Sequence, residues 1–314
     1  MKCVILTCSV GCFAIAALAE MASELQKAYR IGAESKVVYQ VVDDEGNAVA
    51  EAEAEVWYRS YGRPQDDAHW KTKTDTNGVF VAQHRTNERL WVVVKKNGYY
   101  FGSDDVSYFD VKRNSVVDGK WQPYGAKKEI VLKKILNPIA LSNHDELDRR
   151  KVPTYDNWVG FDFEKFDFTP PYGAGACDDV LVRFSLQKGM DYYASIEFAF
   201  TNQSFAGVCP MKKDNHSELK FLHCADTNGY YVAACRYSYE RKFGLPPVMN
   251  TLDEHSYLIF RTRTRVDEHG CLKFAHYGIL EGPLGFVGPG GFSFRRCLFN
   301  RAVNDSNLEW NGHE

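Results

Sequence analysis

Apolar and polar residues alternate along several short stretches in the first half of the chain, as in β-strands with one buried face. Glutamates at positions 51, 53 and 55 alternate with apolar residues at 52, 54 and 56, and lysines at 71 and 73 alternate with Trp70, Thr72 and Thr74. Residues 90–94 are apolar throughout, which is typical of a strand buried in a sheet core. With further β-rich runs at 36–42, 79–81 and 128–132, the pattern predicts an antiparallel β-sandwich over residues 35–135.

Turn signals separate these strands in a fixed order. An acidic, glycine-containing turn at 43–47 follows the first strand, and Asp75-Thr76-Asn77-Gly78 supplies residues that favour tight turns. Two further motifs follow the acidic turn, Thr74-Asp75-x-x-Gly78-x-Phe80 and Val94-x-Lys96-x-Gly98-Tyr99. In this order the motifs resemble the carboxypeptidase regulatory-like domain, a transthyretin-like relative of the immunoglobulin sandwiches.

The resemblance implies a seven-stranded, non-catalytic β-sandwich of a kind commonly appended to exported bacterial proteins. Two stretches depart from the family pattern: a long charged loop at 61–69 and an insertion at 102–122 before the last strand. Loops of that length are often functional, so we expect the binding edge to be particular to this chain.

The second half of the chain again reads as strands. Runs at 180–186 and 192–200 precede two expected hairpins, whose turns lie at 226–229 and 267–270. A charged, proline-containing stretch predicts a linker over 136–156, followed by an antiparallel β-sandwich or jelly-roll-like domain over 157–314. The predicted fold class is therefore all-β, with two domains.

This half contains Gly160-Phe161-Asp162, Pro171-Tyr172-Gly173 and the stretch 304–310. In these residues it resembles uncharacterised exported bacterial proteins. The similarity implies no activity.

The N-terminal residues predict export. Met1-Lys2 precedes an uncharged apolar run over 3–18, and Ala17-Leu18-Ala19 suits signal peptidase cleavage between Ala19 and Glu20. A membrane span needs about 20 apolar residues, and this run is shorter. A lipoprotein anchor at Cys12 is disfavoured, because Ser9-Val10-Gly11 lacks a leucine. We expect signal peptide 1–19 to be removed, leaving a periplasmic or extracellular protein that is not inserted in the membrane.

Cysteine usage agrees with export. Six cysteines follow the expected signal peptide, all in the second half of the chain: Cys177, Cys209, Cys224, Cys235, Cys271 and Cys297. An even number in an exported protein predicts disulfides, and six cysteines allow 15 pairings, which stay open. A zinc site would need close Cys or His pairs such as C-x-x-C, which the sequence lacks. We therefore expect a disulfide-stapled second domain.

Charge and motifs restrict the function classes. The net charge of −3 gives no electrostatic basis for nucleic-acid binding. The sequence contains no Gly-x-Ser-x-Gly, His-Glu-x-x-His, Walker-type or dinucleotide-binding pattern. We expect no cofactor, no metal and no catalytic residues. Acidic pairs such as Asp162 and Glu164 could be drawn as general acid and base, but any exported β-rich chain offers such pairs.

Two groups of residues are candidates for binding. The first is aromatic, because exposed rings stack on sugar faces, and its members are Tyr99, Tyr100, Tyr108, Trp121 and Tyr124. The second is Arg261, Arg263 and Arg265, whose alternation predicts three guanidinium groups on one face of a strand, suited to a carboxylate or sulfate. Ordinary packing of the insertion and a solvated strand face are the competing interpretations.

The leading hypothesis is an exported, non-catalytic binding or scaffold protein of the periplasm or cell surface. Its ligand would be a polymer such as a glycan, or another protein. The alternative is a secreted glycan-active hydrolase with its site in the second domain or the interdomain cleft. Simple assembly through sheet edges is a third, structural interpretation.

Overall fold

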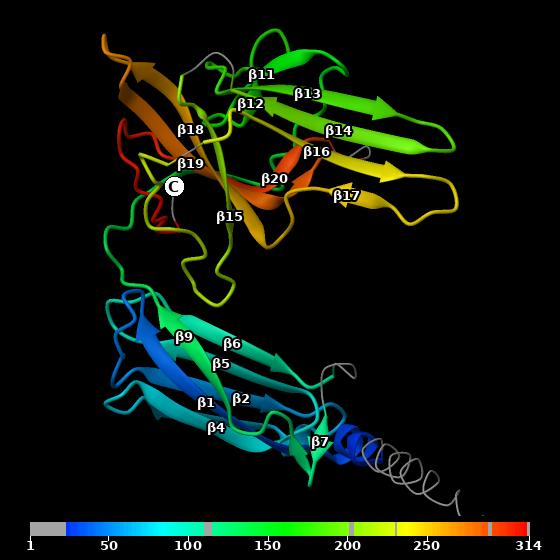
Figure 1. Cartoon of the computed structure of the whole chain (residues 1–314), viewed down its shortest axis with the longest axis vertical. Helices are drawn as coiled ribbons and strands as arrows, with labels where there is room; N and C mark the ends of the chain where they lie inside the picture. Colours follow the sequence, from blue (N-terminus) through cyan, green and yellow to red (C-terminus); the bar gives the residue numbers. More distant parts are fainter. Residues whose placement is uncertain (1–22, 110–114, 201–203, 230, 288–290, 313–314) are drawn as a thin grey trace, which may run out of the picture. The chain divides into compact units, whose positions relative to one another are not determined.

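The computed structural model describes residues 23–109, 115–200, 204–229, 231–287 and 291–312. The chain divides into two compact units: unit 1 comprises Met1–Ile135 with His216–Leu219, and unit 2 comprises Leu136–Asn215 with Lys220–Glu314. Both are built almost entirely of strands (Figure 1), so the all-β prediction is confirmed. The expected signal segment 1–19, with Ala19 and Glu20, lies outside the described residues. Among those described, no helix combines the length and apolar character needed to cross a bilayer.

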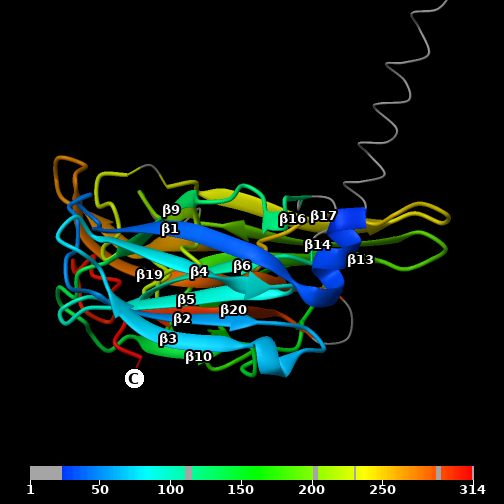
Figure 2. The same ribbon diagram turned by 90° about the horizontal axis from the view of Figure 1, so that it is seen from below.

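Unit 1 contains two sheets. One has the order β4-β1-β8-β7, with β9 pairing in parallel with β1, and the other has the order β3-β2-β5-β6. In Figure 2 the labelled strands of these sheets, such as β1, β4 and β5, run from left to right across the view. The strands are β1 (Ala33–Asp43), β2 (Glu53–Arg59), β3 (Ala68–Lys73), β4 (Val79–Thr86), β5 (Arg89–Lys95), β6 (Gly102–Ser107), β7 (Val116–Val117), β8 (Lys120–Trp121) and β9 (Ala126–Leu132). A 3-10 helix, η1 (Pro64–Asp66), precedes β3, and residues 23–31 are helical.

The core of unit 1 follows from the alternation along the strands. On β2, Ala54, Val56 and Tyr58 are buried, while the residues between them face the other side of the sheet. These side chains pack with Val92 of the neighbouring β5 and with Tyr39 of β1 in the other sheet, all in one apolar cluster. Ala28, in the helical segment 23–31, also belongs to this cluster. The helix is therefore part of the packed unit.

Short strands replace part of the expected insertion at 102–122. Residues 102–107 form β6, which pairs with β5, and β7 and β8 form a small hairpin beyond it. The expected last strand at 128–132 lies within β9. The insertion is therefore partly an integral edge of both sheets.

Unit 2 is also built on two sheets. Their orders are β10-β20-β19-β18-β15 and β12-β11-β13-β14-β16-β17. The strands are β10 (Ser142–Asp145), β11 (Trp158–Asp162), β12 (Asp167–Phe168), β13 (Val180–Gln187), β14 (Tyr192–Ala199), β15 (Gly207–Lys212), β16 (Ala234–Arg241), β17 (Val248–Asn250), β18 (Ser256–Val266), β19 (Leu272–Gly285) and β20 (Ser293–Phe299).

A phenylalanine-rich core joins the two sheets of unit 2. Phe161 and Phe184 from one sheet and Phe294 from the other lie in one buried cluster, in which Phe292 contacts all three rings. All three contacts are edge-to-face, an arrangement that aromatic rings prefer. A smaller cluster, including Tyr257 and Leu308, is buried separately.

Two sequence predictions for this half need correction. Residues 142–145, inside the expected linker 136–156, form β10 and pair with β20, so this stretch belongs to unit 2. The turn at 226–229 forms, but it does not close a hairpin. Cys224 bridges to Asn307 and Val232 bridges to Val208, so the two flanking segments pair elsewhere. The second expected hairpin is confirmed as β18 and β19.

The disulfide prediction is wrong, because all six cysteines are free thiols. The strand ladders place other residues opposite them: Ile259 faces Cys209, and Phe198 faces Cys235. Cys209 on β15 and Cys297 on β20 are separated by β18 and β19. At about 4.8 Å per strand this is roughly 14 Å, whereas a disulfide requires Cα atoms within about 7 Å.

Thiol reactivity tests this correction. A short iodoacetamide pulse on the native protein at pH 8 should label Cys224 and Cys271, which are exposed. Cys235 and Cys297 should stay unlabelled until unfolding, because burial raises the pKa of both thiols, that of Cys235 to about 11. Site-resolved mass spectrometry after unfolding without reductant should find all six labelled. A cysteine labelled only after reduction would contradict the free-thiol arrangement.

Candidate functional site

Three aromatic side chains form a row across the outer face of the β3-β2-β5-β6 sheet of unit 1. Trp57 on β2 pairs with His69 on β3 and with Trp91 on β5. The ring centroids of Trp57 and His69 are 4.8 Å apart with planes 5° apart, and those of Trp57 and Trp91 are 4.8 Å apart with planes 25° apart. Trp91 is 46% exposed. We call His69, Trp57 and Trp91 the aromatic row.

The register of the sheet produces this row. Ring spacing equals the distance between adjacent strands, about 4.8 Å, because each ring stands on a residue directly opposite its neighbour. The alternation that predicted outward-facing Glu53 and Glu55 continues to Trp57. The apolar run at 90–94 gave no such signal for Trp91, because its neighbours on both sides are buried. The sequence therefore indicated the outward position of Trp57 but not that of Trp91, and the aromatic row was not predicted.

A groove of about 300 Å³ lies beside the two indoles and is lined by Trp57, Arg59, Glu88, Arg89 and Trp91. The Arg89 guanidinium is held by Asp105 of β6, with Nε donating at 2.6 Å. Within the described part of the chain, neither the Arg59 guanidinium nor the Glu88 carboxylate forms a hydrogen bond or a close ion pair, although the charge of Glu88 acts on Arg89. The groove thus combines an apolar wall with one free donor group and one free acceptor group.

Charged residues continue the same face beyond the aromatic row. Lys71 on β3 forms ion pairs with Glu53 and Glu55 on β2, and Lys73 pairs with Glu51. Exposed pairs of this kind contribute little to stability, so these residues mainly keep the flanking surface hydrated. The aromatic row therefore borders a hydrated, charged surface on the same face.

The aromatic group predicted from sequence is largely internal. Trp121 is only 2% exposed, stacks on Tyr108 at 5.0 Å, and donates from Nε1 to the Thr86 carbonyl at 2.8 Å. Tyr108 is also buried in the core of unit 1. Its hydroxyl hydrogen-bonds to Ser35. These two residues serve packing, which was the competing interpretation.

The remaining predicted tyrosines are half-buried and do not join the aromatic row. Tyr99 packs against the core of unit 1 and bridges to Lys134. The backbone N–H of Tyr100 donates to the Lys133 carbonyl at 2.8 Å. The Lys120 ammonium lies over Tyr124, 5.1 Å from the centroid of the tyrosine ring. The five predicted aromatic residues therefore do not form an exposed aromatic patch.

The three predicted arginines do not share a face, because β18 carries a bulge between Thr262 and Arg265. Arg263 has a positive φ of 51°, and both its guanidinium and the Thr262 hydroxyl reach Asp179. Adjacent residues thus point to the same partner, which regular alternation forbids. Arg261 is buried and Arg265 is exposed on the same strand.

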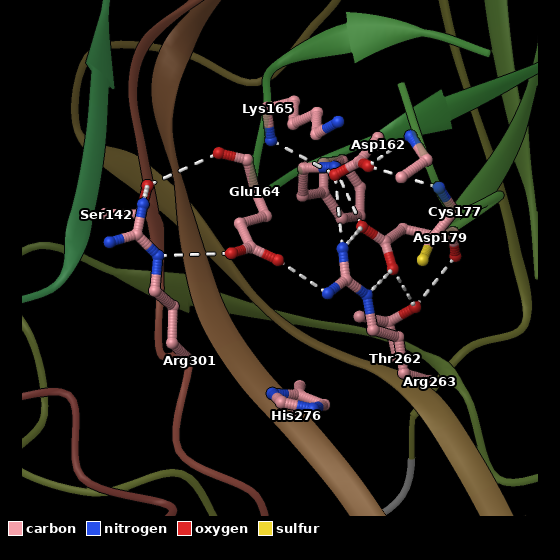
Figure 3. Close-up of polar contacts among 12 residues, drawn as sticks. Ser142, Asp162, Glu164, Lys165, Cys177, Asp179, Thr262, Arg263, His276 and Arg301 are labelled. Atoms are coloured by element: carbon pink, nitrogen blue, oxygen red, sulfur yellow. Dashed lines mark hydrogen bonds and ion pairs between the residues drawn. The ribbon is translucent and has the colours of Figure 1, made fainter. Parts of the chain in front are cut away.

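Arg263 instead forms the centre of a charged network in unit 2 (Figure 3). Its guanidinium donates to Asp179 at 2.9 Å, to Asp162 at 3.1 Å and to Glu164 at 2.7 Å. Asp162 ends β11 in one sheet and Arg263 lies on β18 in the other, so the network joins the two sheets. Arg301 binds Glu164 from the opposite side.

This network is arranged for cohesion and not for proton transfer. The Asp162 carboxylate also accepts the backbone N–H groups of Lys165, Ala176 and Cys177, and the Asp179 carboxylate accepts that of Phe163. Burial raises the pKa of the Asp179 carboxyl, although Arg263 acts in the opposite direction. Burial also raises the pKa of the Cys177 thiol, which makes it a weak nucleophile.

Comparisons with known proteins add little. No protein-family model matches the sequence, and no curated protein is significantly similar to it. Among solved structures, 3-chlorocatechol 1,2-dioxygenase from Rhodococcus opacus 1CP is similar over 33% of this chain and 61% of its own, with 15% identity and a TM-score of 0.26. For chlorocatechol 1,2-dioxygenase from Pseudomonas putida the values are 33%, 61%, 12% and 0.27. This chain thus spans less than two thirds of the length of either structure.

Replacing Arg263 tests the network. Arg263→Ala leaves Asp162 and Asp179, whose side chains are at most 1% exposed, without their counter-charge. Breaking a buried ion pair in this way costs about 3–5 kcal/mol, and urea unfolding should show a loss of that order.

Arg265→Ala is the matched control, because Arg265 lies exposed on the same strand. It should change the unfolding free energy by less than about 0.5 kcal/mol. Equal effects of the two substitutions would show that the network does not hold the sheets together.

Proposed function

We propose that this chain is an exported, non-catalytic binding protein and that the groove beside the aromatic row receives a sugar ring of a polymeric glycan. The observation that carries the proposal is an exposed indole, Trp91, stacked on Trp57 next to unpaired polar groups. Solvent-facing clusters of large aromatic residues are costly to leave hydrated, and they commonly mark interaction sites. Tryptophan and arginine are also the residues that most often dominate binding energy.

The polar residues of the groove favour a sugar over a purely apolar ligand. A pyranose has one weakly polar face for ring contact and hydroxyl groups around its edge. The Arg59 guanidinium can donate to these hydroxyls and the Glu88 carboxylate can accept from them, while Asp105 holds Arg89 in place. Hydrogen bonds that involve a charged partner are the stronger ones. The groove volume of about 300 Å³ suits one ring of a longer chain.

Export and lack of catalysis rest on other observations. The apolar N-terminal run ending at Ala17-Leu18-Ala19 supports delivery to the periplasm or cell surface. The charged cluster around Arg263 has its buried carboxylates bonded to internal donors. The outer face of a β-sheet, such as the one that carries the aromatic row, suits binding of an extended polymer along it.

Binding to a glycan and peptidoglycan-fragment array, followed by calorimetry on the best ligand, tests the proposal. Trp91→Ala should weaken binding by about 10- to 30-fold, because losing a central aromatic contact costs about 1.4–2 kcal/mol. Trp57→Ala should have a comparable effect, since it removes the ring that supports Trp91.

Trp158→Ala is the matched control: Trp158 is 42% exposed but lies on β11 of unit 2. It should leave the affinity unchanged. Equal weakening by Trp158→Ala and Trp91→Ala, or no saturable binding to any glycan on the array, would refute the proposed groove.

A further inference from the structure

Besides the groove in unit 1, a pocket in unit 2 is lined by positively charged side chains and by no acidic one. It has a volume of about 650 Å³, and its lining includes Arg261, Lys273, Thr227, Asn228 and Asn304. Two of the lining side chains are cationic and none is acidic. The pocket lies beside the turn at 226–229 and the start of β19.

Arg261 is the unusual member of this pocket. It is only 4% exposed, yet within the described residues no carboxylate lies in ion-pair distance of its guanidinium. Its Nε donates to the Phe205 carbonyl at 2.6 Å and its Nη1 donates to the Thr227 carbonyl at 2.9 Å. The guanidinium carbon lies 4.0 Å from the ring centroid of Tyr231. Neutral partners alone therefore hold this buried cation.

Such an arrangement is costly without a counter-ion. Arginine is almost never fully buried unless it is paired with an opposite charge. A guanidinium carries five N–H donors in a rigid fork, and the two carbonyls occupy one donor on each of two nitrogens. The remaining donors leave the group able to bind an oxyanion.

The rim of the pocket supplies further donors. Lys273 is exposed on β19, and its ammonium lies 5.5 Å from the ring centroid of Phe274, without an ion-pair partner in the described part of the chain. Asn228 is exposed at the turn, where its backbone N–H is already bonded to Asp226. Asn228 also lines the pocket, and a side-chain amide offers two N–H donors.

We infer that this pocket binds a small oxyanion, that is, a carboxylate, sulfate or phosphate group, with Arg261 at its floor and Lys273 and Asn228 at its rim. Arg261 supplies a preorganised planar donor, because its two carbonyl partners and Tyr231 already fix its orientation. The inference does not rest on the glycan groove, which lies in the other unit.

Calorimetry on the full chain tests this inference. Sodium sulfate, inorganic phosphate and D-glucuronate are titrated at matched ionic strength, with neutral methyl glucoside as the uncharged comparison. At least one oxyanion should bind saturably, and the tightest of the three identifies the group, whereas methyl glucoside should not bind to this pocket. Trp91→Ala should leave this binding unchanged, which separates it from the proposed function.

Two rim substitutions keep the test independent of folding. Lys273→Ala should weaken oxyanion binding by about 3- to 5-fold, as expected for one exposed charge. Asn228→Asp should weaken it further, because it places a negative charge at the rim. Lys242→Ala, which removes an exposed lysine beyond β16, should have no effect. Arg261→Gln should abolish binding in a protein that still folds by circular dichroism.

No saturable binding of any of the three oxyanions would overturn the inference. Equal affinities of the Lys273→Ala and Lys242→Ala proteins would also overturn it.

Discussion

The register of β2 between β3 and β5 is the constraint on which unit 1 depends. It places Val56 and Tyr58 in the core and, by the same alternation, sets Trp57 on the outer face opposite His69 and Trp91. Because side chains alternate with a period of two, a slip of one residue would exchange these faces. It would bury the glutamates and expose the tyrosine. Core packing and the aromatic row are therefore two consequences of one pairing, and the row is held by a rigid sheet.

In unit 2 the important contacts depend on an interruption of the regular alternation, the bulge on β18. The bulge on β18 directs Thr262 and Arg263 to the same carboxylate, at the cost of a residue with φ of 51°. A non-glycine residue in this conformation costs about 1–2 kcal/mol, which the bonds to Asp162, Glu164 and Asp179 offset. The same strand carries Arg261 toward neutral partners instead. Two arginines that are near neighbours in sequence thus have different surroundings, neutral for Arg261 and acidic for Arg263.

These features explain which parts of the structure could be predicted from the sequence. Alternation over 51–56 and 70–74, with the turn at 75–78, predicted β2, β3 and the start of β4, because local periodicity reflects one buried face. The positions of Trp121, Arg263 and the cysteines depend on non-local pairings. Trp121 is internal because β8 brings its indole to the Thr86 carbonyl, and no local pattern encodes that meeting. The bulge likewise has no periodic signal, so the alternation of Arg261, Arg263 and Arg265 predicted a shared face that does not form. The resemblance to the carboxypeptidase regulatory-like domain stays a prediction.

The most direct test of the account follows the indole N–H signals of individual tryptophans by ¹⁵N-resolved NMR while the best array glycan is added. Six tryptophans report on both units. The account predicts shifts for Trp57 and Trp91 that saturate with the ligand, and none for Trp121, whose indole N–H is bonded to the Thr86 carbonyl. Shifts confined to Trp158 and Trp310, which lie in unit 2, would contradict the assignment of glycan binding to the aromatic row.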